Sequence, residues 1–101
     1  MFSLPAYDVV IWHRVQSESA DLHEHIIDRA GRPPDEGIEM HGVRDMHWGF
    51  ETAQEATGFA ESLLELAASD DVLVLSVVAS QDVSFRRKVF KDSRAILSSP
   101  K

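Results

Sequence analysis

The sequence predicts a single α+β domain in which a four-stranded antiparallel sheet carries two helices on one face. Three observations support this class: segments that alternate apolar and polar residues, one clearly capped amphipathic helix, and the order strand, helix, strand, strand, helix, strand. With 101 residues, of which 44% are hydrophobic and 27% charged, the chain can build one hydrophobic core but not two domains. We expect one domain over residues 1–101, with a core at about residues 6–80 and a basic C-terminal extension over residues 84–101.

The first strand and the first helix are predicted between residues 7 and 31. Alternation along the strand gives two faces of different polarity. One face holds Tyr7, Val9, Ile11, His13 and Val15, and the other holds Val10, Trp12 and Arg14. Ser17 and Ser19 are both candidate N-caps for a helix that runs to Ala30, and Gly31 is suited to end that helix in the left-handed conformation.

A β-hairpin is predicted over residues 38–50, after a proline-containing loop at residues 32–37. We expect Val43-Arg44-Asp45 to form its loop, because this register separates apolar from polar side chains, whereas a slip by one residue would mix them. The facing pairs are then Gly42 with Met46, His41 with His47, Met40 with Trp48, Glu39 with Gly49 and Ile38 with Phe50. A two-residue turn is disfavoured by the same pattern.

The best-defined helix follows this hairpin. Thr52 and Glu55 form a capping box, which fixes the start of the helix. Its apolar residues recur at three-and-four spacing, as expected for one buried side: Ala56, Phe59, Ala60, Leu63, Leu66 and Ala67. Residues 72–79 are apolar on both faces except at Ser76 and are read as a fourth strand. Residues 84–96 fit either a short helix, which we favour, or an edge strand at residues 85–90.

This order of elements is that of the ferredoxin-like βαββαβ sandwich, with strand order 4-1-3-2 and the fourth strand at an edge. Its open face, which carries no helix, would hold Trp12, Arg14 and half of the apolar fourth strand. An apolar face left in water invites aggregation, so we expect a partner to cover it.

The residues from Phe50 to Leu63 strengthen this expectation. A strand-end aromatic residue precedes a cap, a Glu-Ala pair and a helical Phe, and this stretch resembles the dimeric α/β-barrel superfamily of small monooxygenase-like proteins. A similar pattern occurs in ligand-sensing domains of the ACT type. The resemblance implies a homodimer in which two ferredoxin-like subunits press their open faces together, and it assigns no functional residue.

The charge distribution bears on partners. A net charge of −7 argues against nucleic-acid binding, which depends on Lys and Arg. Residues 84–101 nevertheless hold six of the ten basic residues, which we interpret as a terminus that complements the acidic body; a clamp for an anionic ligand is the alternative. No apolar run is long enough for a membrane span, and cysteine is absent. We therefore expect a cytoplasmic protein without cofactor or membrane attachment.

The candidate site lies on the open face. The predicted register places His41 beside His47, and imidazoles near carboxylates are suited to acid–base catalysis because they titrate near neutral pH. A polar patch at an interface or in solvent, or a metal site, are the alternatives, and no metal is predicted because nothing fixes a third ligand. Trp12 and Arg14 are the predicted ligand-binding residues. His13 is read as a strand residue whose nitrogen finds a backbone partner.

The sequence is compatible with two classes of function. In the first, the open face lines a cavity that binds or acts on a small apolar or aromatic molecule, with His41, His47, Trp12 and Arg14 at its wall. In the second, the protein is a non-enzymatic regulatory or interaction module, ACT-like, whose open face is only a dimer interface. A connected pocket would favour the first class.

Overall fold

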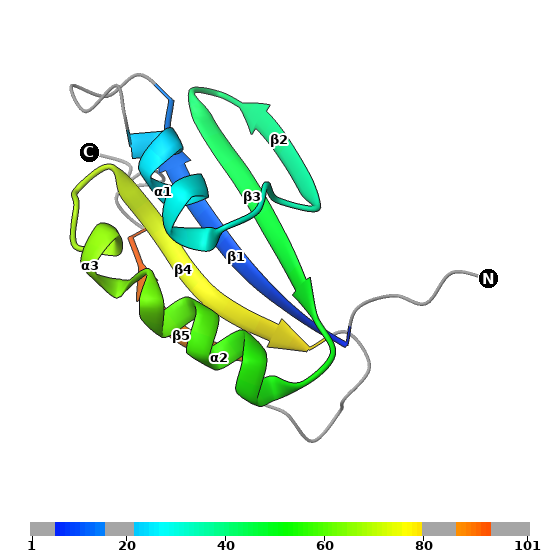
Figure 1. Cartoon of the computed structure of the whole chain (residues 1–101). Coiled ribbons are helices and arrows are strands. Elements are labelled where there is room, and N and C mark those ends of the chain that lie inside the picture. The colour runs from blue at the N-terminus through cyan, green and yellow to red at the C-terminus, as the bar shows by residue number, and fades with distance from the viewer. Residues whose placement is uncertain (1–5, 16–21, 80–86, 94–101) are drawn as a thin grey trace.

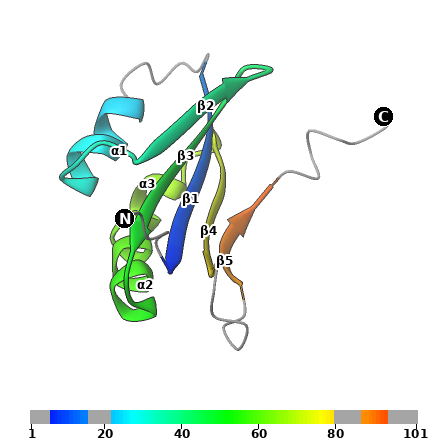
Figure 2. The ribbon, with the colours of Figure 1, turned by 90° about the vertical axis from the view of Figure 1, so that its right-hand side faces the viewer.

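A five-stranded antiparallel sheet with three helices makes up the part of the chain that the computed structural model describes, residues 6–15, 22–79 and 87–93 (Figure 1). The elements are β1 (Tyr7–Arg14), α1 (Leu22–Ala30), β2 (Glu36–Met40), β3 (Val43–Phe50), α2 (Ala53–Ser62), α3 (Leu64–Ala67), β4 (Val72–Ala79) and β5 (Lys88–Asp92). The strand order is β2-β3-β1-β4-β5. Seen edge-on, the three helices lie on one side of the sheet, so the opposite side is the open face (Figure 2).

The α+β class is confirmed, but the numbers of strands and helices differ from the prediction. The favoured helix within residues 84–96 is wrong: residues 88–92 form β5, and β4 is therefore an inner strand rather than an edge. The candidate caps Ser17 and Ser19 lie outside the described residues. A strand as apolar on both faces as β4 gains from a neighbour along each edge, because each neighbour pairs its backbone and shields its side chains.

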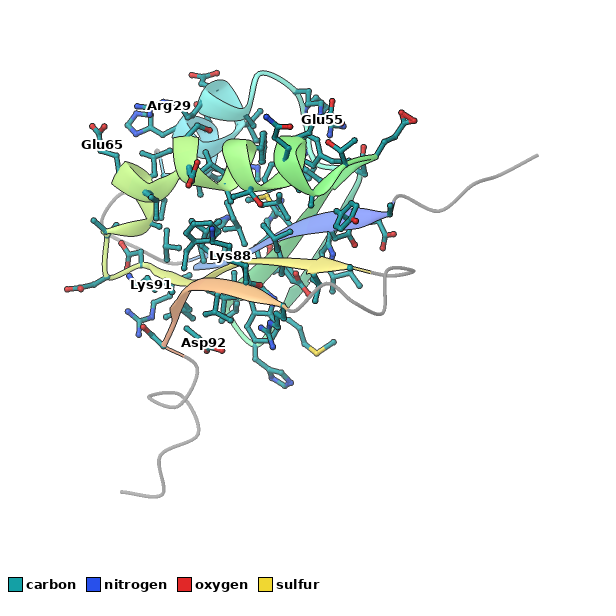
Figure 3. All side chains as sticks on the ribbon, turned by 90° about the horizontal axis from the view of Figure 1, so that it is seen from below. Arg29, Glu55, Glu65, Lys88, Lys91 and Asp92 are labelled. Carbon is teal, nitrogen blue, oxygen red and sulfur yellow. The ribbon has the colours of Figure 1, made fainter. Side chains whose placement is uncertain are left out.

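Lys91 helps to hold β5 against the rest of the molecule. Its Nζ donates to the backbone oxygens of Ala67, the last residue of α3, and of Ser69, two residues further on, each at 2.8 Å. Figure 3 shows Lys91 with Lys88 and Asp92 on β5, and Glu65 on the helix layer. A cation at the carboxyl end of a helix satisfies free carbonyl groups. This contact supports the interpretation that basic residues near the C-terminus complement the chain itself.

The predicted long helix is divided. Its start is confirmed, because the Glu55 backbone N–H donates to Thr52 Oγ1 at 3.1 Å and the Thr52 hydroxyl donates to Glu55 Oε1 at 3.0 Å. At Leu63 the backbone leaves the helical conformation, with φ −100° and ψ 0°, and separates α2 from α3. Leu63 is nevertheless 1% exposed, so the break keeps its side chain in the core.

The core lies between the sheet and the helices, and Trp48 is its largest side chain. Trp48 is fully buried, packs against Phe59 with ring centroids 5.4 Å apart, and donates from Nε1 to the Arg32 carbonyl oxygen at 3.1 Å. Phe50 also packs against Phe59, with ring centroids 4.9 Å apart. The aromatic strand and the capped helix therefore meet in the core, as their apolar stripes predict.

The hairpin register is wrong in the prediction. Met40 faces Val43 and Glu36 faces His47, so β2 and β3 are joined by the two-residue turn His41-Gly42. Both turn residues have positive φ, 55° and 78°. This combination is typical of type I′ turns, whose twist matches that of the strands. The change of register moves Met40 from the expected core side to the open face.

None of the helices in the described ranges is long and apolar enough to span a membrane.

Candidate functional site

A cavity of about 390 Å³ opens on the open face, where β1, β2 and β3 run side by side. Asp45 on β3 faces Ile38 on β2 and Trp12 on β1, so these three side chains share one face of the sheet. The next rung adds Met40 opposite Val43. The lining consists of Trp12, Ile38, Met40, His41, Val43 and Asp45. Four of these six side chains are hydrophobic, those of Trp12, Ile38, Met40 and Val43. Asp45 is the acidic residue in the lining.

The two apolar side chains of β2 are unusually accessible. Ile38 is 60% exposed and Met40 is 61% exposed. Both belong to an edge strand that the sheet pairs on one side only, with β3. Large aliphatic side chains beside a cavity are typical of surfaces that receive an apolar ligand or a protein partner.

A charged cluster adjoins the cavity. His47 Nε2 lies 2.8 Å from Asp45 Oδ1, and His47 Nδ1 lies 3.3 Å from Asp8 Oδ2. The three side chains are each about one-third exposed. Asp45 Oδ1 itself is buried and has ion-pair contact with His47 but no aligned hydrogen bond. The imidazole therefore bridges two carboxylates, one of which is part of the cavity wall.

The structure separates the predicted catalytic histidines. His41 lies in the turn and lines the cavity, whereas His47 faces Glu36 across β2 and β3 and reaches the cavity only through Asp45. The interpretation of His41 and His47 as facing residues is wrong, because it depended on the three-residue loop. Their catalytic roles remain predictions.

The predicted ligand-binding residues also lie in different surroundings. Trp12 forms part of the cavity wall. Arg14, two residues further along β1, donates to the Asp70 carbonyl oxygen at 3.3 Å and lies 3.9 Å from the Asp71 carboxylate. Arg14 is thus tied to the turn before β4 and does not line the cavity. Its role in binding remains a prediction.

A different histidine pair forms on the helix side of the sheet. His13 is 3% exposed, and its Nδ1–H donates to the Arg14 carbonyl oxygen at 3.0 Å, which confirms the expected backbone partner. In that tautomer Nε2 accepts from His23 Nδ1, 3.4 Å away on α1. Burial lowers the pKa of both imidazoles, and the nearby Arg44 guanidinium lowers both further.

Within the described ranges, no group of three or more His, Asp or Glu side chains is arranged to hold a metal ion. Asp8, His47 and Asp45 contact one another instead of converging on a common point.

Comparison with protein-family models, with curated proteins and with solved structures finds no match to this chain. The fold and the site define a general class, a small α+β protein with an apolar cavity on the sheet face opposite its helices. Within that class, function must be inferred from the cavity, since one fold supports many activities.

Proposed function

We propose that this protein is a ferredoxin-like homodimer that binds a small apolar or aromatic molecule in the open-face cavity. The observation that carries the proposal is the cavity itself, about 390 Å³ in volume and walled by Trp12, Ile38, Met40 and Val43. Its size falls in the range of about 300–1,000 Å³ that is usual for small-molecule sites. The alternative, an open face used only for dimer contact, does not require such a cavity.

The order of β1 to β4 supports the ferredoxin-like assignment. Without β5, the sheet reads β2-β3-β1-β4, with the first and third strands in the centre. The helices follow β1 and β3 in the chain and cover a single face (Figure 2). In this proposal β5 is an addition to the edge of a βαββαβ unit.

Exposed apolar side chains support the homodimer. Ile38 and Met40 lie at one edge of the open face, and Val89, 49% exposed on β5, faces Ser76 on the same side at the other edge. A second copy of the chain seated on this face would cover both edges and close the cavity. The open side of a binding cavity is then also an interface, which accounts for its apolar rim.

The interface is tested by Ile38→Asp. We expect the wild-type protein to behave as a dimer of the 11.3 kDa chain and the variant as a folded monomer. The introduced carboxylate would be buried without a partner on association, whereas Ile38 is 60% exposed within one chain. Light scattering after size exclusion gives the mass, and circular dichroism confirms folding.

Leu64→Asp is the matched control. Leu64 is 44% exposed but belongs to α3 on the helix side, so its substitution is expected to leave the dimer intact. A wild-type protein that stays at 11.3 kDa at micromolar concentration would refute the dimer.

Ligand binding is tested by a thermal-shift series of small aromatic compounds, indole and 2-naphthol among them. A compound present at about 100 times its Kd stabilises the native state by about 2.7 kcal/mol, which raises the Tm of a domain of this size by roughly 10–20 °C. We expect Trp12→Ala to remove this shift and Trp12→Phe to retain most of it, because Phe restores an aromatic wall. Equal shifts in wild type and Trp12→Ala would show that binding occurs elsewhere.

A further inference from the structure

Asp45 is the carboxylate that faces the cavity. Its Oδ1 is buried and contacts His47, while the side chain as a whole remains 34% exposed. Accessibility of this side chain must therefore come from the remaining atoms, which include Oδ2. Asp45 lines the cavity and its carboxylate contacts no cationic side chain other than His47 among the described residues, so its exposed atoms can contact a ligand there.

The contact with His47 restrains the position of the Asp45 carboxylate. His47 contacts Asp45 with one ring nitrogen and Asp8 with the other, and all three side chains project from the central strands β1 and β3. A carboxylate fixed by a neighbour loses little rotamer freedom when it binds a ligand. The cavity thus presents an oriented acceptor rather than a mobile surface acid.

The charge around the cavity is negative. With both carboxylates ionised, the cluster of Asp8, His47 and Asp45 keeps a net charge of −1 even when the imidazole is protonated. No Lys or Arg occurs in the described lining, since Arg14 is tied to the turn before β4 and Arg44 pairs with Glu39 at 3.0 Å on the helix side. A protein with a net charge of −7 adds to the attraction for cations.

The cavity wall beside Asp45 suits the same kind of ligand. The Trp12 ring lies on the rung of Asp45, and an aromatic face beside a carboxylate is favourable for an ammonium group. Ile38 and Met40 provide the apolar surface for the rest of the molecule. We propose that the ligand of this cavity is an apolar molecule with a single positively charged amine, which pairs with Asp45. This inference rests on the proposed function and specifies the chemical class of its ligand.

Three indoles of similar shape test the inference by calorimetry on the full chain: tryptamine, which is cationic, 3-propylindole, which is neutral, and indole-3-propionate, which is anionic. A charge-assisted hydrogen bond is expected to make tryptamine bind about ten-fold more tightly than 3-propylindole, with indole-3-propionate weakest. Asp45→Asn is expected to remove the advantage of tryptamine and leave the affinity for 3-propylindole unchanged. Asp28→Asn, an exposed acid on α1, is the matched control and is expected to retain the advantage.

Each outcome bears on one proposal or both. If 3-propylindole binds as tightly as tryptamine, the amine class is refuted while the apolar cavity stands. If none of the three compounds binds, both the amine class and the proposed function are refuted for molecules of this shape. Because Asp45→Asn removes the contact with His47 and can disturb folding, the ranking on the unmodified protein decides by itself. A tryptamine advantage that survives in a folded Asp45→Asn variant also refutes the assignment.

Discussion

Replacing Trp48 with Ala is expected to lower the free energy of unfolding by about 3–5 kcal/mol. Trp48 has no exposed surface, packs against Phe59 and donates a hydrogen bond to the Arg32 carbonyl oxygen. Truncation removes these contacts, leaves a large cavity and orphans one acceptor. Small domains have total stabilities of about 5–15 kcal/mol, so the variant is expected to be marginally folded at room temperature.

Trp12→Ala is the matched comparison, because the same side chain is removed from the opposite face of the sheet. Trp12 is half-buried at the cavity wall, and its loss is expected to cost clearly less stability than the loss of Trp48. Denaturant titrations of both variants, compared by midpoint and slope, measure the difference. Equal losses would mean that the assignment of one tryptophan to the core and the other to the wall of the open-face cavity is wrong.

The parts of the fold that the sequence predicts correctly depend on short-range signals. Thr52 and Glu55 are three residues apart, and the hydrogen bond between them involves only residues of one helical turn. Alternation along β1 likewise assigns Ile11 to the core and Trp12 to the open face, since successive side chains of a strand point to opposite sides. Both conclusions need only the neighbouring residues.

The hairpin register could not be obtained in the same way. The predicted register assumed that every large apolar residue of the hairpin lies under the helices, but Ile38 and Met40 are exposed at the cavity. The turn residues gave no warning, because His41-Gly42 lacks the Asn or Asp that normally signals positive φ before a glycine. In the sequence, these exposed apolar side chains thus look the same as side chains of the core.

The error in the predicted hairpin also affects the prediction of the candidate site. The sequence predicts Trp12 and His41 as site residues, and both line the cavity, whereas it places Asp45 in the loop and gives no signal for Asp8. Asp45 lies opposite Trp12 because β3 starts at Val43 and pairs with β1, whereas the predicted loop leaves residues 43–45 out of the strand. The contact between His13 and His23 depends in turn on how α1 packs on the sheet, which is a long-range property of the fold.

That second histidine pair predicts how stability depends on pH. His13 and His23 have pKa values lowered from the ordinary value of 6.5, mainly because burial disfavours the charged imidazole. Below pH 6.5, His13 and His23 therefore bind protons more readily in the unfolded chain than in the folded chain. The contribution of these two imidazoles to the free energy of unfolding is fully present above about pH 6.5. It is lost as the pH falls from 6.5 through their lowered pKa values in the folded state.

The surrounding charges act in both directions but do not reverse this sign. Arg44 lowers the pKa of both imidazoles, whereas Asp71 and Glu39 raise that of His13 and Glu24 raises that of His23. Protonation of both rings would also place two positive charges at a contact of 3.4 Å between ring nitrogens. The expected consequence is a weaker attachment of α1 to the sheet in acid.

Denaturant titrations at pH 7.5 and pH 5.0 test the prediction. We expect the wild-type protein to lose more stability between these conditions than His13→Gln or His23→Gln, because each variant has one lowered imidazole fewer. His25→Gln is the matched control: His25 is exposed on α1, so this variant is expected to lose as much as the wild type. Since the comparison is between two pH values within each variant, a constant cost of the substitution itself does not affect it. If all four proteins lost the same amount, the acid sensitivity would have to come from other groups, and the pair would have only a packing role.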